Sequence, residues 1–194
     1  MRKRVATLTS NILNPFLVIL AVILLLSFQS TTSILEALKW TLILIVLSIL
    51  PVFLVIVYLV HNDRLEGLFI NVRKQRTKTY LLAGVCSGAG CVILLYLGAP
   101  EMLVAAFVTG LSATVLFMGI NLIWKISLHT AIIAASVTVL VILYGSIAMA
   151  TVVLLPLMAW ARIELEHHSL AQVTAGTLLA ALIVIAVFYP FGLV

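Results

Sequence analysis

Long apolar runs separated by short polar segments dominate the pattern along this chain. Each run approaches the length of about 20 residues that crosses a bilayer as a helix. A helix satisfies its own backbone polar groups, which hydrocarbon cannot do, and the alternation typical of a lipid-facing barrel strand is absent. The expected spans are residues 11–29, 38–60, 80–97, 101–123, 129–145, 147–161 and from about 170 onward.

Polar segments and prolines divide these runs further. The longest polar loop is expected at 61–79, and Pro51 and Pro156 are expected to kink the spans that contain them.

The basic first residues, followed by an apolar run, superficially resemble a signal peptide. Because no small-residue cleavage site follows Phe28, an uncleaved first span is the better interpretation.

Composition points to lipid as the solvent of this chain. Of 194 residues, 64% are hydrophobic and 9% are charged, whereas a soluble domain carries about 25% charged residues. Mean hydropathy is +1.33. We therefore expect an all-α polytopic transmembrane bundle of six or seven spans, forming a single domain over residues 1–194. Membrane lipids are the expected partners, and no nucleic acid is expected.

The basic residues indicate an orientation. Of the 11 Lys and Arg residues, ten lie at the N-terminus, in the 61–79 loop, at Lys125 or at Arg162, all on one side by this span count. The other side has only Lys39. The positive-inside rule makes the basic side cytoplasmic. The expected location is the plasma (inner) membrane of a prokaryote.

Three polar clusters border the spans. They cover residues 73–80, 125–129 and 162–173, and an even number of spans separates each from the next. All three are therefore expected on the same membrane face. Together they supply several cations, imidazoles and a hydroxyl, which suit an anion with several oxygens, above all a phosphate.

These clusters resemble the signatures of the type 2 phosphatidic acid phosphatase superfamily, whose soluble relatives include vanadium haloperoxidases. The Ser-Arg-x5-His-x3-Asp signature is matched by Arg162, His168 and, at the Asp position, Gln172. The Pro-Ser-Gly-His signature is matched by Ser127 and His129.

The remaining Lys-x6-Arg-Pro signature is matched loosely. Lys78 stands at its Arg position, the leading Lys is missing, and Lys74 and Arg76 lie nearby. The resemblance covers residues 60–180, which are expected to form a core like the lipid phosphatase bundle.

The resemblance implies a mechanism without a metal or other cofactor. His168 would attack phosphorus to form a phosphohistidine, and His129 would protonate the leaving lipid alcohol. The phosphate-binding side chains that it implies are Lys74, Arg76, Lys78, Ser127 and Arg162.

The neutral Gln172 departs from the family pattern. The Asp of the family orients the nucleophilic histidine and stabilises its cation. Glu164 lies four residues before His168 and would reach the imidazole if that stretch were helical. We therefore hypothesise that Glu164 replaces the missing Asp.

The leading hypothesis is a phosphatase acting on a lipid phosphate or pyrophosphate, either polyprenyl or phosphatidic-acid-like. The alternative is a catalytically impaired relative that binds anionic lipid or serves as a membrane assembly partner. A transporter is disfavoured because ionisable residues are almost absent within the spans. The last span has no lysine for a retinal Schiff base. Gly84-x3-Gly88 predicts close helix packing, either internal or in a homodimer.

Overall fold

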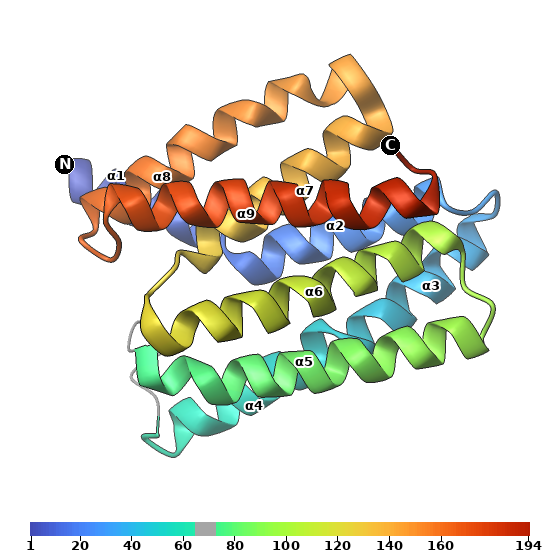
Figure 1. Ribbon diagram of the computed structural model, residues 1–194, viewed down its shortest axis with the longest axis horizontal. Coiled ribbons are helices and arrows are strands. Elements are labelled where there is room, and N and C mark those ends of the chain that lie inside the picture. The colour runs from blue at the N-terminus through green and yellow to red at the C-terminus, as the bar shows by residue number, and fades with distance from the viewer. Residues whose placement is uncertain (65–72) are drawn as a thin grey trace. The chain divides into compact units, whose positions relative to one another are not determined.

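A computed structural model describes residues 1–64 and 73–194 of the chain, shown in Figure 1. Within these residues every regular element is a helix, which confirms the all-α prediction. The elements are α1 (Arg2–Ile12), α2 (Pro15–Gln29), α3 (Ile34–Leu47), α4 (Ile49–His61), α5 (Arg73–Tyr96), α6 (Glu101–Ile123), α7 (Leu128–Tyr144), the 3-10 helix η1 (Gly145–Val153), α8 (Leu154–Glu164), α9 (Leu170–Phe188) and the short 3-10 helix η2 (Tyr189–Phe191).

The described helices have the length and the surface of membrane spans. Apolar side chains remain exposed along them, as Leu178, Leu182 and Ile185 do on α9. Such surfaces are stable in lipid and rare on soluble monomers. The chain is thus an integral membrane protein. Within residues 1–64 and 73–194, six stretches are long and apolar enough to cross a bilayer, namely Arg2–Gln29, Ile34–His61, Arg76–Tyr96, Glu101–Ile123, Leu128–Glu164 and Leu170–Phe191.

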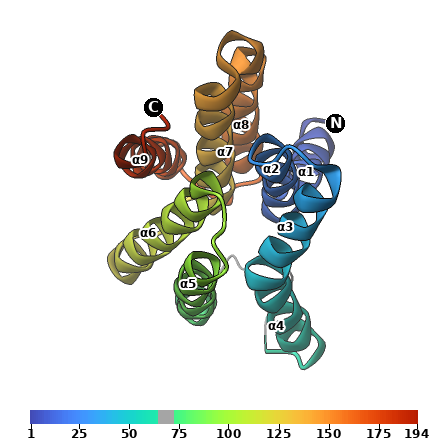
Figure 2. The same cartoon turned by 90° about the vertical axis from the view of Figure 1, so that its right-hand side faces the viewer.

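The fifth stretch turns back on itself. Its 37 residues comprise α7, η1 and α8, so it covers both expected spans at 129–145 and 147–161. Gly145 adopts φ +56° where α7 ends, a conformation that glycine reaches without a steric penalty. Ile133 and Val137 of α7 pack against Met158 of α8. Figures 1 and 2 show α8 returning along α7.

The first two stretches are each interrupted. α1 ends before Pro15, and the Asn14 side chain accepts a hydrogen bond from the backbone N–H of Leu17 at 3.0 Å, which caps α2. α3 and α4 are separated at Ser48, three residues before Pro51. Proline cannot donate to the preceding turn, so the break lies where the sequence predicts a kink. The first helix begins at Arg2, well before the expected start at residue 11.

The helices group into two compact units, which are described separately. The first comprises residues 1–22 and 126–194, and the second comprises residues 23–125. In the first unit, α7 packs against α9 and α1 packs against α8. This unit contains both histidines of the predicted site, His129 and His168, together with Arg162.

In the second unit, α5 and α6 form the main helix pair. Gly90 makes the closest approach, because a Cβ atom built there would overlap the ring of Phe107. Gly84 faces Thr114 of α6 across ordinary contact distance, whereas a Cβ atom on Gly88 would meet no other atom within 4 Å. Gly84 therefore faces α6 without close packing, and the closest small-residue contact of this helix pair is at Gly90.

Gly176 joins α9 to α7, and its replacement should loosen this pair. A Cβ atom there would lie 2.7 Å from the Ser127 carbonyl oxygen and 3.0 Å from the Thr130 hydroxyl. We expect Gly176→Ala to destabilise the protein by about 1–3 kcal/mol through overpacking. The measurement is thermal unfolding of the purified protein in detergent. Gly119→Ala is the control, because no atom lies within 4 Å of its added methyl group; equal midpoints for both variants would contradict the prediction.

Candidate functional site

The start of α7 and the start of α9 are joined by direct contacts. The backbone N–H of Ser127 donates to the Gln172 carbonyl at 3.4 Å, and the Thr130 hydroxyl donates to the Val173 carbonyl at 3.3 Å. The glycine at 176 permits this approach. Ser127 is also the N-cap of α7, where its hydroxyl accepts from the Thr130 N–H.

The turn after α8 brings His168 back to the end of that helix. The carbonyl of Arg162 accepts hydrogen bonds from the backbone N–H groups of His167 and His168, at 3.2 and 3.3 Å. Glu166 has φ +58° within this turn, a left-handed conformation that is unfavourable for a residue with a side chain. The start of α7, the end of α8 and the start of α9 therefore lie together within one unit.

Gln172 holds the imidazole of His168. The His168 Nδ1 and the Gln172 Oε1 are 3.1 Å apart, and the same oxygen accepts from the Ser169 N–H at 3.2 Å. Because a backbone N–H can only donate, the Gln172 atom that faces it is the carbonyl oxygen. His168 then carries its proton on Nδ1, which leaves the lone pair of the neutral ring on Nε2. The Ser169 hydroxyl accepts from the Gln172 N–H and completes a capping box.

The polar groups of this region are buried and lie beside positive helix ends. The side chains of His129, Arg162 and His168 are 7%, 2% and 6% exposed. Ser127 and Ser169 begin α7 and α9, and each helix N-terminus carries about half a positive charge. A guanidinium, two imidazoles and two helix N-termini are groups of the kind that bind a phosphate.

Glu164 does not share a helical turn with His168, which its predicted contact with the imidazole requires. α8 ends at Glu164, so residues 164–168 are not a continuous helical turn, and Gln172 is the residue that contacts Nδ1. The Glu164 carboxylate instead forms an ion pair with Arg2, at 3.3 Å. The physical reason is the turn after α8, which redirects the chain before His168.

A second ion pair joins the same two segments. The Lys3 ammonium donates to the Glu166 carboxylate at 2.7 Å, which holds the pKa of Glu166 below its ordinary value. Because the pKa of the Glu166 carboxyl is lower in the folded protein than in the unfolded chain, the pair stabilises the fold at pH values above the unfolded-state pKa. This stabilisation is lost as pH falls through the folded-state pKa. Its contribution is small because both side chains are exposed.

The basic residues of the first predicted signature belong to the second unit. Arg76 is buried near the Tyr80 hydroxyl in the first part of α5, and Lys78 is exposed. The side chain of Lys74 lies outside the described residues. A common site for these residues and the histidines stays a prediction.

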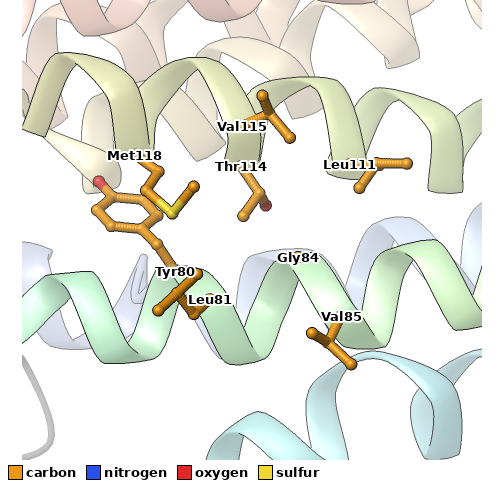
Figure 3. Close-up of a pocket in the computed structure, with 8 residues that line it drawn as sticks. All are labelled: Tyr80, Leu81, Gly84, Val85, Leu111, Thr114, Val115 and Met118. Carbon is orange, nitrogen blue, oxygen red and sulfur yellow. The ribbon is translucent and has the colours of Figure 1, made fainter.

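The second unit also contains an apolar cavity of about 280 Å³ between α5 and α6. Figure 3 shows the ring of Tyr80 beside Met118 at one end, while Gly84 and Thr114 line the middle. The missing side chain of Gly84 opens this space. Its lining is almost entirely apolar and suits hydrocarbon rather than a polar ligand.

The sequence patterns missed one contact of this site. Arg162 donates from Nη1 to the hydroxyl of Ser10 in α1, at 3.0 Å, and no local motif links residues so far apart. The capping box could have been found, because Ser169-x-x-Gln172 fits its pattern.

Among the described residues, no group of three His, Cys, Asp or Glu side chains could hold a metal ion. No family model, curated protein or solved structure matches this chain.

Proposed function

We propose that this protein is a membrane phosphatase that hydrolyses a lipid phosphate or pyrophosphate, of the polyprenyl or phosphatidic-acid-like class. The observation that carries the proposal is that His129 near the start of α7, Arg162 at the end of α8 and His168 just before α9 are all buried in one unit. Fixed cations and helix N-termini favour an anion with several oxygens. The two imidazoles of the same unit add the groups needed for nucleophilic and acid–base chemistry.

In the proposed reaction, His168 Nε2 attacks phosphorus and a P–N bond forms as the P–O bond to the lipid breaks. His129 in its protonated form gives its proton to the leaving alkoxide. Water then attacks the phosphohistidine, and the neutral His129 takes up a proton from that water, so inorganic phosphate leaves and both histidines return to their first state. Arg162 binds the phosphoryl oxygens, assisted by Ser127, and stabilises the charge that develops on them.

Further elements of the proposal come from the sequence. From the sequence alone, Lys74, Arg76 and Lys78 stay predicted as phosphate-binding side chains, as in the resembling family. The excess of Lys and Arg on one side favours a site at the cytoplasmic face. The plasma membrane of a prokaryote is the proposed location.

The proposal is tested by phosphate release from a panel of lipid phosphates in mixed micelles. The panel contains a phosphatidic acid, a polyprenyl pyrophosphate and a water-soluble phosphate monoester without a lipid chain. We expect the purified protein to release phosphate from at least one lipid substrate and far less from the soluble ester. A folded protein that releases none from any lipid would refute the proposal.

A second function, anionic lipid binding without turnover, is favoured by one observation. The amide of Gln172 contacts His168 Nδ1 where the family has a carboxylate, so the imidazolium formed during reaction is less stabilised. In a serine protease, the equivalent Asp-to-Asn change lowers kcat by about 10⁴. A protein of this second kind would bind lipid phosphates without releasing phosphate, and His168→Ala would leave its function unchanged.

A further inference from the structure

The first helix contributes a side chain to the candidate site. α1 packs along α8, and this packing places the Ser10 hydroxyl 3.0 Å from Nη1 of Arg162. Both side chains are buried, at 4% and 2% exposure. A charged donor inside a protein forms a stronger hydrogen bond than a neutral one. This contact is therefore well placed to fix the guanidinium.

The chemistry of the pair suits orientation rather than neutralisation. A guanidinium is planar, so holding one of its nitrogens restricts the plane in which the remaining N–H groups point. Serine is neutral and accepts the hydrogen bond without adding a negative charge. Ser10 can thus orient Arg162 without neutralising its positive charge.

Two ion pairs join the start of α1 to the end of α8 and to the turn that follows it, which carries His168. Arg2 pairs with Glu164 at the end of α8, and Lys3 pairs with Glu166 in the turn. They hold the first turn of α1, while Ser10 lies two turns further along the same helix. Together these contacts attach α1 to the site along most of its length.

We propose that Ser10 is a positioning residue, which orients the Arg162 guanidinium for the phosphoryl oxygens and makes α1 part of the site. The catalytic consequence rests on the proposed phosphatase function. The orientation of Arg162 in the free protein does not. The two can therefore be tested separately.

The test compares Ser10→Ala with the wild type by two measurements on the full chain in detergent. The first is NMR of the arginine side-chain nitrogens, with the Arg162 signal identified by its absence in Arg162→Lys. We expect the Nη signal of Arg162 to shift and to exchange faster once the hydroxyl is removed. The second is kinetics of phosphate release. We expect kcat to fall by about tenfold or more, with KM little changed, because the interaction acts on the transition state.

Thr7→Ala is the matched control, because the Thr7 hydroxyl donates only within α1, to the Lys3 carbonyl. It should leave both measurements unchanged. Cysteine is close to serine in size but is a weaker acceptor, so Ser10→Cys should change both the Arg162 signal and kcat in the same direction as Ser10→Ala, and by less. If Ser10→Ala does not fold, Ser10→Cys takes its place in both measurements. Arg162 signals equal to wild type in the Ser10 variants would overturn the proposal. Altered signals in a protein without phosphatase activity would support the positioning role and refute the proposed function.

Discussion

Replacing His168 by alanine is expected to lower phosphate release on the order of 10⁴-fold or more, to nearly the uncatalysed level. Alanine removes the Nε2 lone pair that would form the P–N bond, and no other described group is placed by Gln172 in the same way. The fold should survive, since the loss of the hydrogen bond to Gln172 costs about 0.5–1.5 kcal/mol. Phosphate release and thermal unfolding, measured on the same preparation, check both statements.

His61→Ala is the control for this variant. His61 ends α4 in the second unit and is exposed, so its loss should leave phosphate release unchanged. If His168→Ala retained wild-type turnover while folded, His168 would not be the nucleophile. A protein active in this way would need another attacking group.

Replacing Gln172 by glutamate is expected to raise kcat, by up to about 10⁴-fold if the missing charge is the main defect. Glutamate has the same shape and keeps the capping box with Ser169, because Ser-x-x-Glu is equally suited to it. Its carboxylate would face His168 Nδ1, where the Gln172 oxygen now lies at 3.1 Å. A negative charge there stabilises the imidazolium that forms on His168 as the lipid alcohol leaves phosphorus.

Thr174→Glu provides the matched charge. Thr174 is an exposed residue of α9, two positions beyond Gln172, so a carboxylate there has the same formal charge without the contact to His168. Only Gln172→Glu should raise turnover, measured as phosphate release from the best lipid of the panel. An equal gain in both variants would show a general electrostatic effect, and no gain in either would show that the amide is not what limits the reaction.

The sequence predicted the helical stretches well, because length and apolarity decide what can cross a bilayer. It predicted α6 to the residue and placed a break near Pro51. It missed α1, since Arg2, Lys3 and several hydroxyl residues make that segment resemble a polar flank. The helix is stable there through contacts with α8, which have no signal in the local pattern.

The candidate site was predictable only where it depends on local spacing. The resemblance placed Gln172 beside His168, and the two side chains are in contact because the residue at the third helical position reaches back to the turn before the helix. The proposed reach of Glu164 assumed a helix through residue 168, but α8 ends before that turn. The contact between Ser10 and Arg162 depends on packing between distant segments, so it required the structure.

Trapping of a phosphohistidine tests directly whether His168 is the nucleophile of a phosphatase. The protein is mixed with a lipid phosphate labelled with ³²P, quenched rapidly in alkali, where a phosphohistidine survives, and digested for peptide analysis. If His168 is the nucleophile, the peptide that contains His168 carries an acid-labile label, and this label is absent from His168→Ala. Phosphate release without any label on His168, or a label that persists in His168→Ala, would contradict it.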